Sequence, residues 1–433
     1  MKRINSIIKK ALCLLAAGAI LVSAVGCKTS ATVQPINNGA VSTAKTMNLM
    51  ANFTSKNTAK PVVPANESAV KAADFAVRLF KAGAGEGNSL ISPLSVLAAL
   101  SMTANGAKGD TLAEMEKVLG MSTDELNEFY YNYAAQLLNS EKAKLELANS
   151  IWFTSDERFT VNDAFLQKNA DYYGADAYKA PFDEKTRADI NNWVKEKTDG
   201  MIPEILSKDV NMGDAVMFLI NALAFDAEWD RIYKESEVGN AAFTLENGDT
   251  RSAEFMYGKE NTYLKADNAE GFIKYYSGGR YAFCALLPNE GVSVSELVAS
   301  LDGEKLMGIL NGAKDEPVMT AIPKFETDFS CELSDVLGNM GMPSAFNSSV
   351  SDLSALGSST EGNLYISRVF HKTFISVDER GTRAGAATAV MVCDEDAMLY
   401  EHTIRLDRPF VYMLIDTETN LPFFIGTMMD VGA

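Results

Sequence analysis

The stretch HKTFISVDERGTRAGAATAVMV, residues 371–392, decides how the rest of the chain is interpreted. Its first part, from Thr373 to Asp378, has the β-branched and aromatic residues of a strand and leads into a charged turn. A run of small residues follows from Ala384 to Ala389. Because this run has no bulky side chain to bury in a core, its composition predicts a loop.

The same run also has the two-residue period of a strand. One face carries no charge and consists of Thr382, Ala384, Ala386, Thr388, Val390 and Val392. The other face holds the single charge and consists of Arg383, Gly385, Ala387, Ala389 and Met391. We therefore predict a segment with two states, an exposed loop and a strand inserted into a sheet.

The composition of the whole chain is that of a globular protein. Its 433 residues, 47% hydrophobic and 22% charged, can bury a sizeable core in one large domain or in two or three smaller ones. The formal net charge of -18, without any run of Lys or Arg, disfavours nucleic acid as a partner.

The first 26 residues have the features of an export signal. Basic residues at positions 2, 3, 9 and 10 precede an apolar run from Ala11 to Val25. The small residue before Cys27 is similar to a bacterial lipobox, although Ala24 stands where that pattern prefers Leu. We expect a lipoprotein-type signal peptide over 1–26 and lipid attachment at Cys27. The product would be a cell-surface lipoprotein or a secreted protein, with ordinary cleavage or an uncleaved anchor as alternatives.

The residues after the signal peptide are predicted to form a tether followed by one domain. Residues 27–66 are rich in Ala, Ser, Thr, Asn and Pro, which predicts a flexible tether. Over 67–433 helical patterns come first and strand patterns later, without a repeat or linker, which predicts a single α+β domain. A long apolar run from Ala215 to Phe225 predicts a buried central strand. No other apolar stretch approaches the ~20 residues of a membrane span, so membrane contact is expected only through the lipid.

The numbers and positions of cysteine and histidine residues argue against disulfide bonds and metal sites. Cys284, Cys331 and Cys393 lie scattered without paired spacing, so a disulfide scaffold is not expected. His371 and His402 are the only histidines, so no metal site or cofactor is expected either.

Eight segments along the domain together are specific. They are NSLISPLSVLAALSMTANGAKGDT (88–111), INNWVKEKTDGMI (190–202), FLINALAFDAEW (218–229), IPKFE (322–326), LSDVLGNMGMPSAF (333–346), ISRVFHKTFISVDERGT (366–382), RPFVYMLID (408–416) and FFIGTM (423–428). In this order and spacing the chain resembles the serpins, a family of serine protease inhibitors. The resemblance implies an α+β fold with three β-sheets (A, B and C), about nine helices and an exposed reactive loop, here about 381–400.

The resemblance also implies a function. The target protease cleaves the loop and forms an acyl-enzyme, and the N-terminal half of the loop then inserts as a new strand into the largest sheet, which distorts the protease. The chain would be a monomeric, irreversible suicide inhibitor and not an enzyme. Its partners would be serine proteases and, as a second class, cysteine proteases. The alternative is a non-inhibitory serpin that acts as a binding or structural surface protein.

Matching positions carry the family's functional residues. The shutter beneath the sheet would be Ser92, Ser95, Asn221 and His371. The breach at the top would be Trp229, Lys324 and Glu379, with Lys324 and Glu379 as an ion pair. The hinge would be Glu379, Gly381, Thr382, Ala384, Ala386, Ala387 and Thr388. Arg383 departs from the family, in which an acidic residue is common there, and we expect altered insertion kinetics from it.

Two counts place the scissile bond differently. Counting forward from Glu379 gives Glu395–Asp396, and counting back from Arg408 gives Met398–Leu399. No Arg or Lys lies between Arg383 and Arg405, so elastase-like or subtilisin-like targets are favoured over trypsin-like ones.

Cys393 is open to further interpretations. It is a further candidate for the scissile bond, an oxidation-sensitive exposed thiol, or an inert loop residue. A catalytic pair of Cys393 with His402 lacks a glycine turn for an oxyanion and is disfavoured.

Overall fold

The chain divides into two units, Met1–Thr43 and Ala44–Ala433, and the computed structural model describes residues of the second. The described ranges are 45–137, 140–213, 215–382 and 401–432. They contain nine α-helices: α1 (Asn66–Gly83), α2 (Pro93–Ala104), α3 (Gly109–Leu119), α4 (Thr123–Gln136), α5 (Asp163–Tyr172), α6 (Glu184–Lys197), α7 (Val294–Ser300), α8 (Gly303–Asn311) and α9 (Ser334–Met340). No helix in these ranges is long and apolar enough to cross a bilayer.

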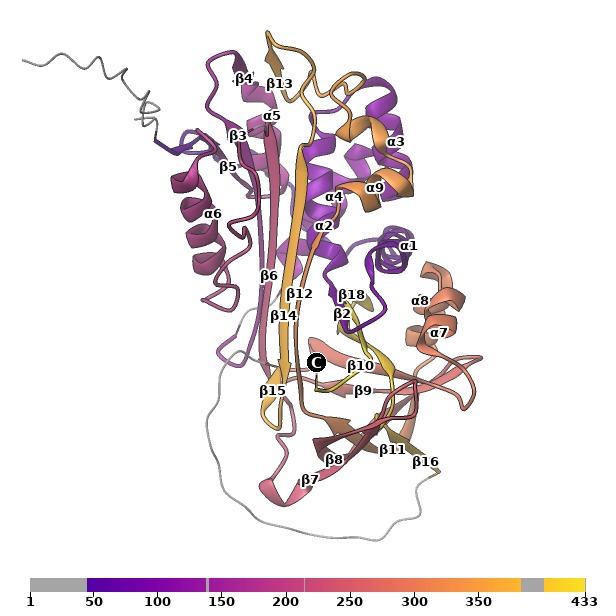
Figure 1. The fold of residues 1–433 in the computed structure, drawn as a ribbon. Coiled ribbons are helices and arrows are strands. Elements are labelled where there is room, and N and C mark those ends of the chain that lie inside the picture. The colour runs from indigo at the N-terminus through magenta and orange to yellow at the C-terminus, as the bar shows by residue number, and fades with distance from the viewer. Residues whose placement is uncertain (1–44, 138–139, 214, 383–400, 433) are drawn as a thin grey trace, which may run out of the picture. The chain divides into compact units, whose positions relative to one another are not determined.

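Three sheets complete the fold (Figure 1). The first has seven strands in the order β1 (Met47–Asn48), β5 (Asp176–Ala180), β3 (Ala143–Thr154), β6 (Met217–Glu228), β15 (Gly381–Thr382), β14 (Arg368–Val377) and β12 (Phe325–Glu332). The second has nine: β16 (His402–Arg405), β11 (Lys314–Pro323), β8 (Thr250–Lys265), β9 (Ala269–Tyr275), β10 (Tyr281–Pro288), β17 (Phe410–Asp416), β18 (Leu421–Met428) and β2 (Ser89–Ile91), with β7 (Val238–Thr244) beside β8. The third pairs β4 (Phe159–Val161) with β13 (Gly357–Ser359). The predicted α+β fold with three sheets and about nine helices is confirmed.

The seven-stranded sheet, called the main sheet below, is covered on both sides. Helix α2 packs on one side and α6 on the other (Figure 1). All twelve residues of α2 are buried, and Trp193 of α6 packs in the smaller hydrophobic core with Phe218 of β6. Because both faces of β6 are covered, its sequence is a continuous apolar run rather than an alternating one. The prediction of a buried central strand here is confirmed.

The prediction of a flexible tether over 27–66 is wrong for its described part. Strand β1 pairs with the edge strand β5, with Met47 opposite Lys179. Further along, the Tyr131 hydroxyl donates to the carbonyl of Ala59 at 2.7 Å, and the amide of Lys56 donates to an Asp171 carboxylate oxygen at 2.6 Å. The segment 45–65 is attached to the domain by these hydrogen bonds and by Leu49, Met50 and Phe53, which are partly buried against the hydrophobic core.

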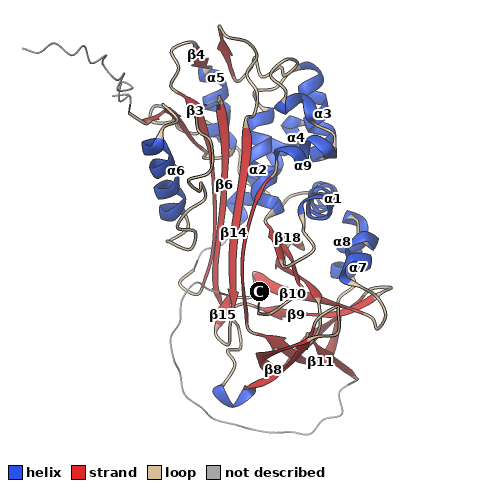
Figure 2. Cartoon of the chain, in the orientation of Figure 1, coloured by secondary structure: helices blue, strands red, loops and turns tan. Residues whose placement is uncertain are grey.

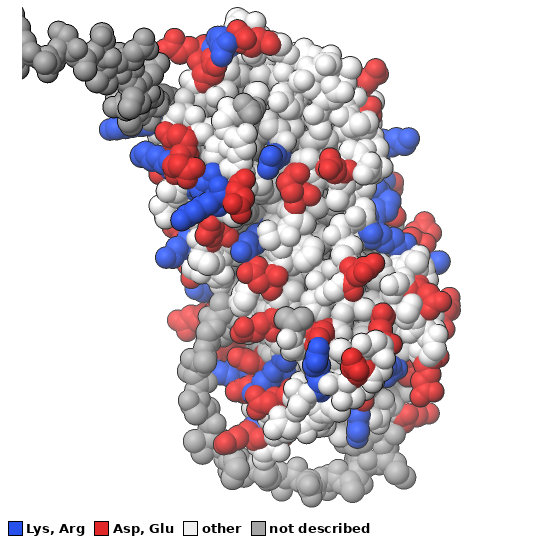
Figure 3. All heavy atoms as spheres, in the orientation of Figure 1, with Lys and Arg blue, Asp and Glu red and all other residues white. Residues whose placement is uncertain are grey.

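The surface shown in Figure 3 has basic and acidic side chains interspersed over the described elements. Opposite charges often meet there; examples are the pairs Lys71–Glu67, Lys265–Glu270 and Lys372–Asp328. These local pairs leave the acidic excess of the whole chain uncompensated, and an acidic surface is the opposite of a basic nucleic-acid footprint.

Candidate functional site: a strand slot in the main sheet

Strands β6 and β14 pair directly at one end only. Their parallel ladder runs from Arg368↔Phe218 to Lys372↔Ala222. At the other end β15 lies between them, and Thr382 is paired antiparallel with both Ala227 of β6 and Val377 of β14. Figure 2 shows β15 at this end of the two long strands. We call the place between β6 and β14, from the end of the ladder to β15, the slot.

The register is the same at both ends of the slot. Lys372 lies opposite Ala222, and Val377 lies level with Ala227 across β15, so the numbering offset is 150 in both places (372 - 222 and 377 - 227). Strands β6 and β14 therefore keep the same relative register along the slot. A strand that continued β15 could pair with both of them without a register shift.

Of the three hinge residues that the structure describes, Gly381 and Thr382 fit tightly into the sheet. A Cβ on Gly381 would lie 2.0 Å from the carbonyl oxygen of Ala227, so only glycine is accommodated there. Thr382 is 1% exposed, and its hydroxyl is hydrogen-bonded to the hydroxyl of Tyr276. This buried position of β15 thus holds a small, neutral side chain, and a charge buried there without a partner would be costly.

The breach residues surround the turn before the hinge. Lys324 Nζ lies 2.8 Å from Glu379 Oε2, as the sequence predicted, and 3.5 Å from Glu254 Oε2. Partial burial opposes ionisation of Glu379, but the Lys324 ammonium outweighs it and holds the pKa of that carboxyl below its ordinary value. The indole N–H of Trp229 donates to the carbonyl of Asp378 at 2.8 Å. The pair and the indole together fix the turn that leads into β15.

The shutter residues form one buried hydrogen-bond network. Asn221 is its centre: its Oδ1 contacts Ser95 Oγ and, at 3.0 Å, His371 Nδ1, while its Nδ2 donates to the Ser95 carbonyl and to Asn149 Oδ1. The amide of Ser92 donates to His371 Nε2 at 3.0 Å. The network lies beside the ladder, since Asn221 and His371 are themselves paired across β6 and β14. It joins the two strands that an inserted strand would separate.

The hydrogen bonds determine the state of His371. Because Nε2 accepts from an amide, the proton of the neutral ring is on Nδ1 and is donated to Asn221. Burial lowers the pKa of His371 from 6.5 to about 3. The shutter is therefore built on a neutral imidazole with both ring nitrogens used.

The sequence analysis did not identify several residues that belong to the shutter and breach networks. Asn149 and Asp378 belong to these networks, Asp378 through its Oδ1, which accepts from the amides of Arg380 and Gly381. Tyr276 stacks on Trp229 with ring centroids 4.4 Å apart. The position of Asn149 among the apolar residues of β3 was a usable signal, whereas nothing local distinguished Tyr276 from a core tyrosine.

The remaining predicted residues lie outside the described ranges. They are the hinge residues Ala384, Ala386, Ala387 and Thr388, the scissile-bond candidates Cys393, Glu395, Asp396, Met398 and Leu399, and the lipidation candidate Cys27. His402 is described: it stacks on Tyr263 and its Nε2 lies 3.0 Å from Glu316 Oε2. Within the described ranges no three potential ligands gather to hold a metal ion.

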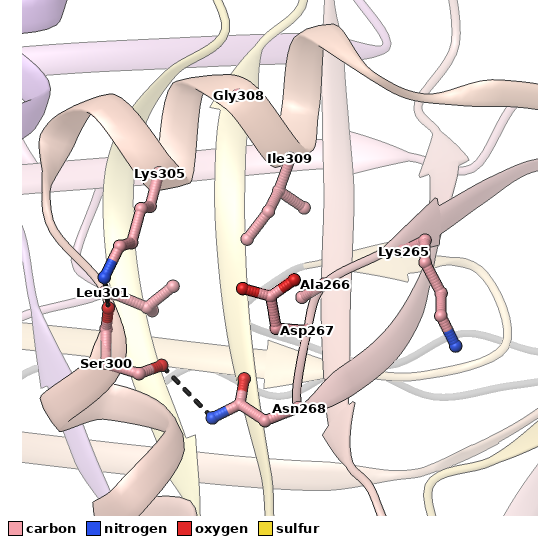
Figure 4. A pocket seen from close by; sticks show the side chains of 9 residues that line it. All are labelled: Lys265, Ala266, Asp267, Asn268, Ser300, Leu301, Lys305, Gly308 and Ile309. Carbon is pink, nitrogen blue, oxygen red and sulfur yellow. Dashed lines mark hydrogen bonds between the residues drawn. The ribbon is translucent and has the colours of Figure 1, made fainter.

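A separate hollow lies between the β8–β9 turn and α8 (Figure 4). Its polar groups bond to one another: Asn268 Nδ2 donates to Ser300 Oγ at 3.2 Å, and Lys305 Nζ donates to the Ser300 carbonyl at 3.0 Å. None of its lining residues belongs to the slot.

The fold contains a main sheet in which β6 and β14 pair directly at one end and through β15 at the other. The model of the family "Serpin (serine protease inhibitor)" matches residues 70–431, and the chain belongs to this family. It is 32% identical over 381 residues to an uncharacterized serpin-like protein of Thermococcus kodakarensis, with 86% of each chain covered. It is 30% identical to leukocyte elastase inhibitor A of Mus musculus, covering 81% of this chain and 96% of that one.

Solved structures give the same result. The thermophilic serpin tengpin in its native state is 45% identical, with a TM-score of 0.85, covering 89% of this chain and all of that one. Tengpin in its latent state is 46% identical, with a TM-score of 0.76, covering 86% of this chain and all of that one. At nearly equal identity, the conformation described here is more similar to the native state.

Proposed function

We propose that this chain is an irreversible inhibitor of serine proteases of the elastase-like or subtilisin-like class. The observation that carries the proposal is β15, which has entered the slot with Thr382 in register on both sides. The similarity to leukocyte elastase inhibitor A and the absence of Arg or Lys between Arg383 and Arg405 support the target class. Under this proposal, the protease recognises Met398 or another of the scissile-bond candidates in the loop.

The chemistry requires only the protease's own catalytic group and the loop. The protease serine oxygen adds to the scissile carbonyl carbon, the C–N bond breaks, and the new amino terminus leaves with a proton. An ester then joins the protease to the N-terminal part of the loop. Inhibition results only if this part of the loop inserts into the sheet faster than water hydrolyses the ester.

The register predicts where the inserted strand would lie. Each step forward along an antiparallel strand moves one residue back along both neighbours. Thr388, six residues beyond Thr382, would therefore lie between Asn221 and His371. It would face the same side as their side chains, so its hydroxyl would replace the hydrogen bond that Asn221 and His371 lose when the strands separate.

Insertion is favourable because it completes a sheet. A new central strand gains ladder hydrogen bonds on both sides, at ~1 kcal/mol net for each. It also buries the small neutral face of the loop at ~25 cal/mol per Å² of apolar area. Over about ten residues these terms supply the work needed to displace a covalently attached enzyme.

The test is to incubate the protein with an elastase and look for a complex of summed mass that survives SDS. Mass spectrometry of the released C-terminal peptide then identifies the scissile bond. Thr382→Arg should be cleaved without forming the complex, because the buried position cannot accept a charge, whereas Thr382→Ser should still form it. Cleavage of the unaltered protein without a complex would reject inhibition and favour the binding or structural alternative.

We also propose that the protein is exported and lipidated at Cys27. The leader and the lipobox-like residues before Cys27 support this. Expression in a bacterium with labelled fatty acid should give a labelled protein, and Cys27→Ser should remove the label. Labelling that persists in Cys27→Ser would contradict the assignment.

A further inference from the structure

A buried lysine lies directly behind the breach. Lys274, in β9, is 1% exposed. Its Nζ donates to Glu260 Oε1 at 2.8 Å and to the carbonyl of Arg231 at 3.3 Å. The same Nζ lies 5.1 Å from the ring centroid of Trp229 and 4.4 Å from that of Tyr233. The cation is thus enclosed by a carboxylate, a carbonyl and two aromatic faces.

The two aromatic residues also hold the turn before the hinge. The amide of Trp229 donates to the carbonyl of Arg380 at 2.8 Å, and the amide of Tyr233 donates to the carbonyl of Glu379 at 2.9 Å. The segment 229–233 therefore has two sides: its rings and the Arg231 carbonyl contact Lys274, and its amides contact the turn. A shift of the rings would shift the amides with them.

Packing alone does not explain a charge at this position. Burial lowers the pKa of Lys274 and raises the pKa of Glu260, so the low-dielectric surroundings disfavour the charged form of each. A buried ion pair is often no more stable than a well-packed apolar pair of similar volume. What the pair adds is directional contacts, which define one arrangement of Trp229 and Tyr233.

We propose that Lys274 is a positioning residue for strand insertion. Through Trp229 and Tyr233 it fixes the turn at 378–381, and it thereby sets the rate at which the slot accepts a strand. The inference rests on the proposed function in one respect, since both require that the slot can be filled.

A synthetic peptide tests this without a protease. The probe is the fluorescently labelled peptide TRAGAATAVMV, which has the sequence of residues 382–392. Its uptake by the full chain is followed by fluorescence anisotropy at constant temperature. Lys274→Met should take up the peptide about tenfold faster than the unaltered protein, a small part of the effect that breaking a buried ion pair can have. Lys274→Arg, which keeps the cation, should stay near the original rate.

A double variant separates positioning from general stability. Lys274→Met combined with Glu260→Met removes the cation without leaving a buried carboxylate unpaired, so the fold should persist even where Lys274→Met alone does not fold. It should still take up the peptide faster. Lys265→Met is the matched control, because Lys265 forms an exposed ion pair with Glu270 at 2.7 Å on the same two strands.

The outcomes distinguish this inference from the proposed function. Unchanged uptake in the double variant would overturn the inference, even if the unaltered protein forms the protease complex. Faster uptake in the variants, with no protease complex in the unaltered protein, would support the inference and reject the inhibitory function. No uptake by the unaltered protein or by either Lys274 variant would overturn the inference, while the protease-complex assay decides the proposed function separately.

Discussion

At the scale of single residues, the site depends on neutral side chains in buried positions. Thr382 and His371 are both buried and both uncharged, and each is placed by hydrogen bonds. The sequence pattern identified both, because a small residue at the start of a period-two run and a histidine in a matching motif are local signals. It did not reveal Tyr276, the partner of Thr382, since side-chain contacts between distant strands leave no periodic trace.

His371 gives the protein a pH dependence with a definite sign. Its folded pKa of about 3 lies below the ordinary value of 6.5, so between these values the unfolded chain binds a proton that the folded protein excludes. Stability from this residue is therefore complete above pH 6.5 and is lost as the pH falls toward 3. Urea unfolding should show a loss of up to about 1.4 kcal/mol for each pH unit in this window.

The variant His371→Gln is the control for that measurement. It can still form hydrogen bonds in the shutter but has no titrating group there. Its absolute stability should be lower, and its slope between pH 7 and pH 5 should be shallower than that of the unaltered protein. Equal slopes would show that another group dominates the acid response.

At the scale of elements, the slot is a matter of pairing between strands that are far apart in sequence. The strand character of β6 and β14 could be predicted from their apolar and β-branched residues. The partial entry of β15 could not, because it depends on Ala227 and Val377, which lie about 150 residues apart. The docking of residues 45–65 was also unpredictable, because it combines pairing with an edge strand and three neighbouring apolar contacts, Leu49, Met50 and Phe53, which have no extended periodic pattern.

The breach ion pair should have a modest, salt-dependent effect. Lys324 and Glu379 are 25% and 36% exposed, so losing their attraction alone costs about 1 kcal/mol or less. Glu379→Lys replaces attraction by repulsion and should lower the thermal midpoint of the intact protein. The reversed pair, Lys324→Glu with Glu379→Lys, should recover part of the loss, because the new carboxylate would also lie near Glu254. High salt should reduce the difference between the single variant and the original.

The N-terminal segment should protect a sheet edge. Strand β1 covers β5 on the side facing away from β3. A chain that begins at Asn66 would leave the backbone groups of β5 exposed for pairing with other molecules. We expect it to self-associate in size-exclusion chromatography at high concentration, while a chain that begins at Ala44 stays monomeric. Monomeric behaviour of both would contradict a protective role.

At the scale of the whole molecule, the family and fold follow from many motifs in a fixed order, which no single motif establishes. Whether the folded protein holds its loop outside or inside the main sheet does not follow from these motifs. The proposed function requires that the intact protein is not at its free-energy minimum, because filling the slot must release free energy. The sequence could suggest two states for the loop but not which of them the folded chain adopts, because that depends on the competition between whole sheets.

Cleavage in the loop should therefore raise thermal stability. A protein cut between Val392 and Leu399 is free to complete the main sheet, and its unfolding midpoint should exceed that of the intact protein by well over ten degrees, about the shift expected from several kcal/mol. Differential scanning calorimetry of intact and cleaved samples measures this. Thr382→Arg is the control, because its cleaved form should gain much less.

The last strand of the nine-stranded sheet has a consequence for how the protein is made. Strand β18 pairs with β2, so Ile425 lies opposite Ile91, and the amide of Asp430 donates to the side chain of Asn88. A ribosome adds β18 more than 300 residues after β2. Strand β2 therefore remains without its partner β18 until synthesis is almost finished. Contacts between residues so far apart in sequence also form slowly. A chain truncated before Leu421 should remain a target for proteases and chaperones, however complete its remaining elements are.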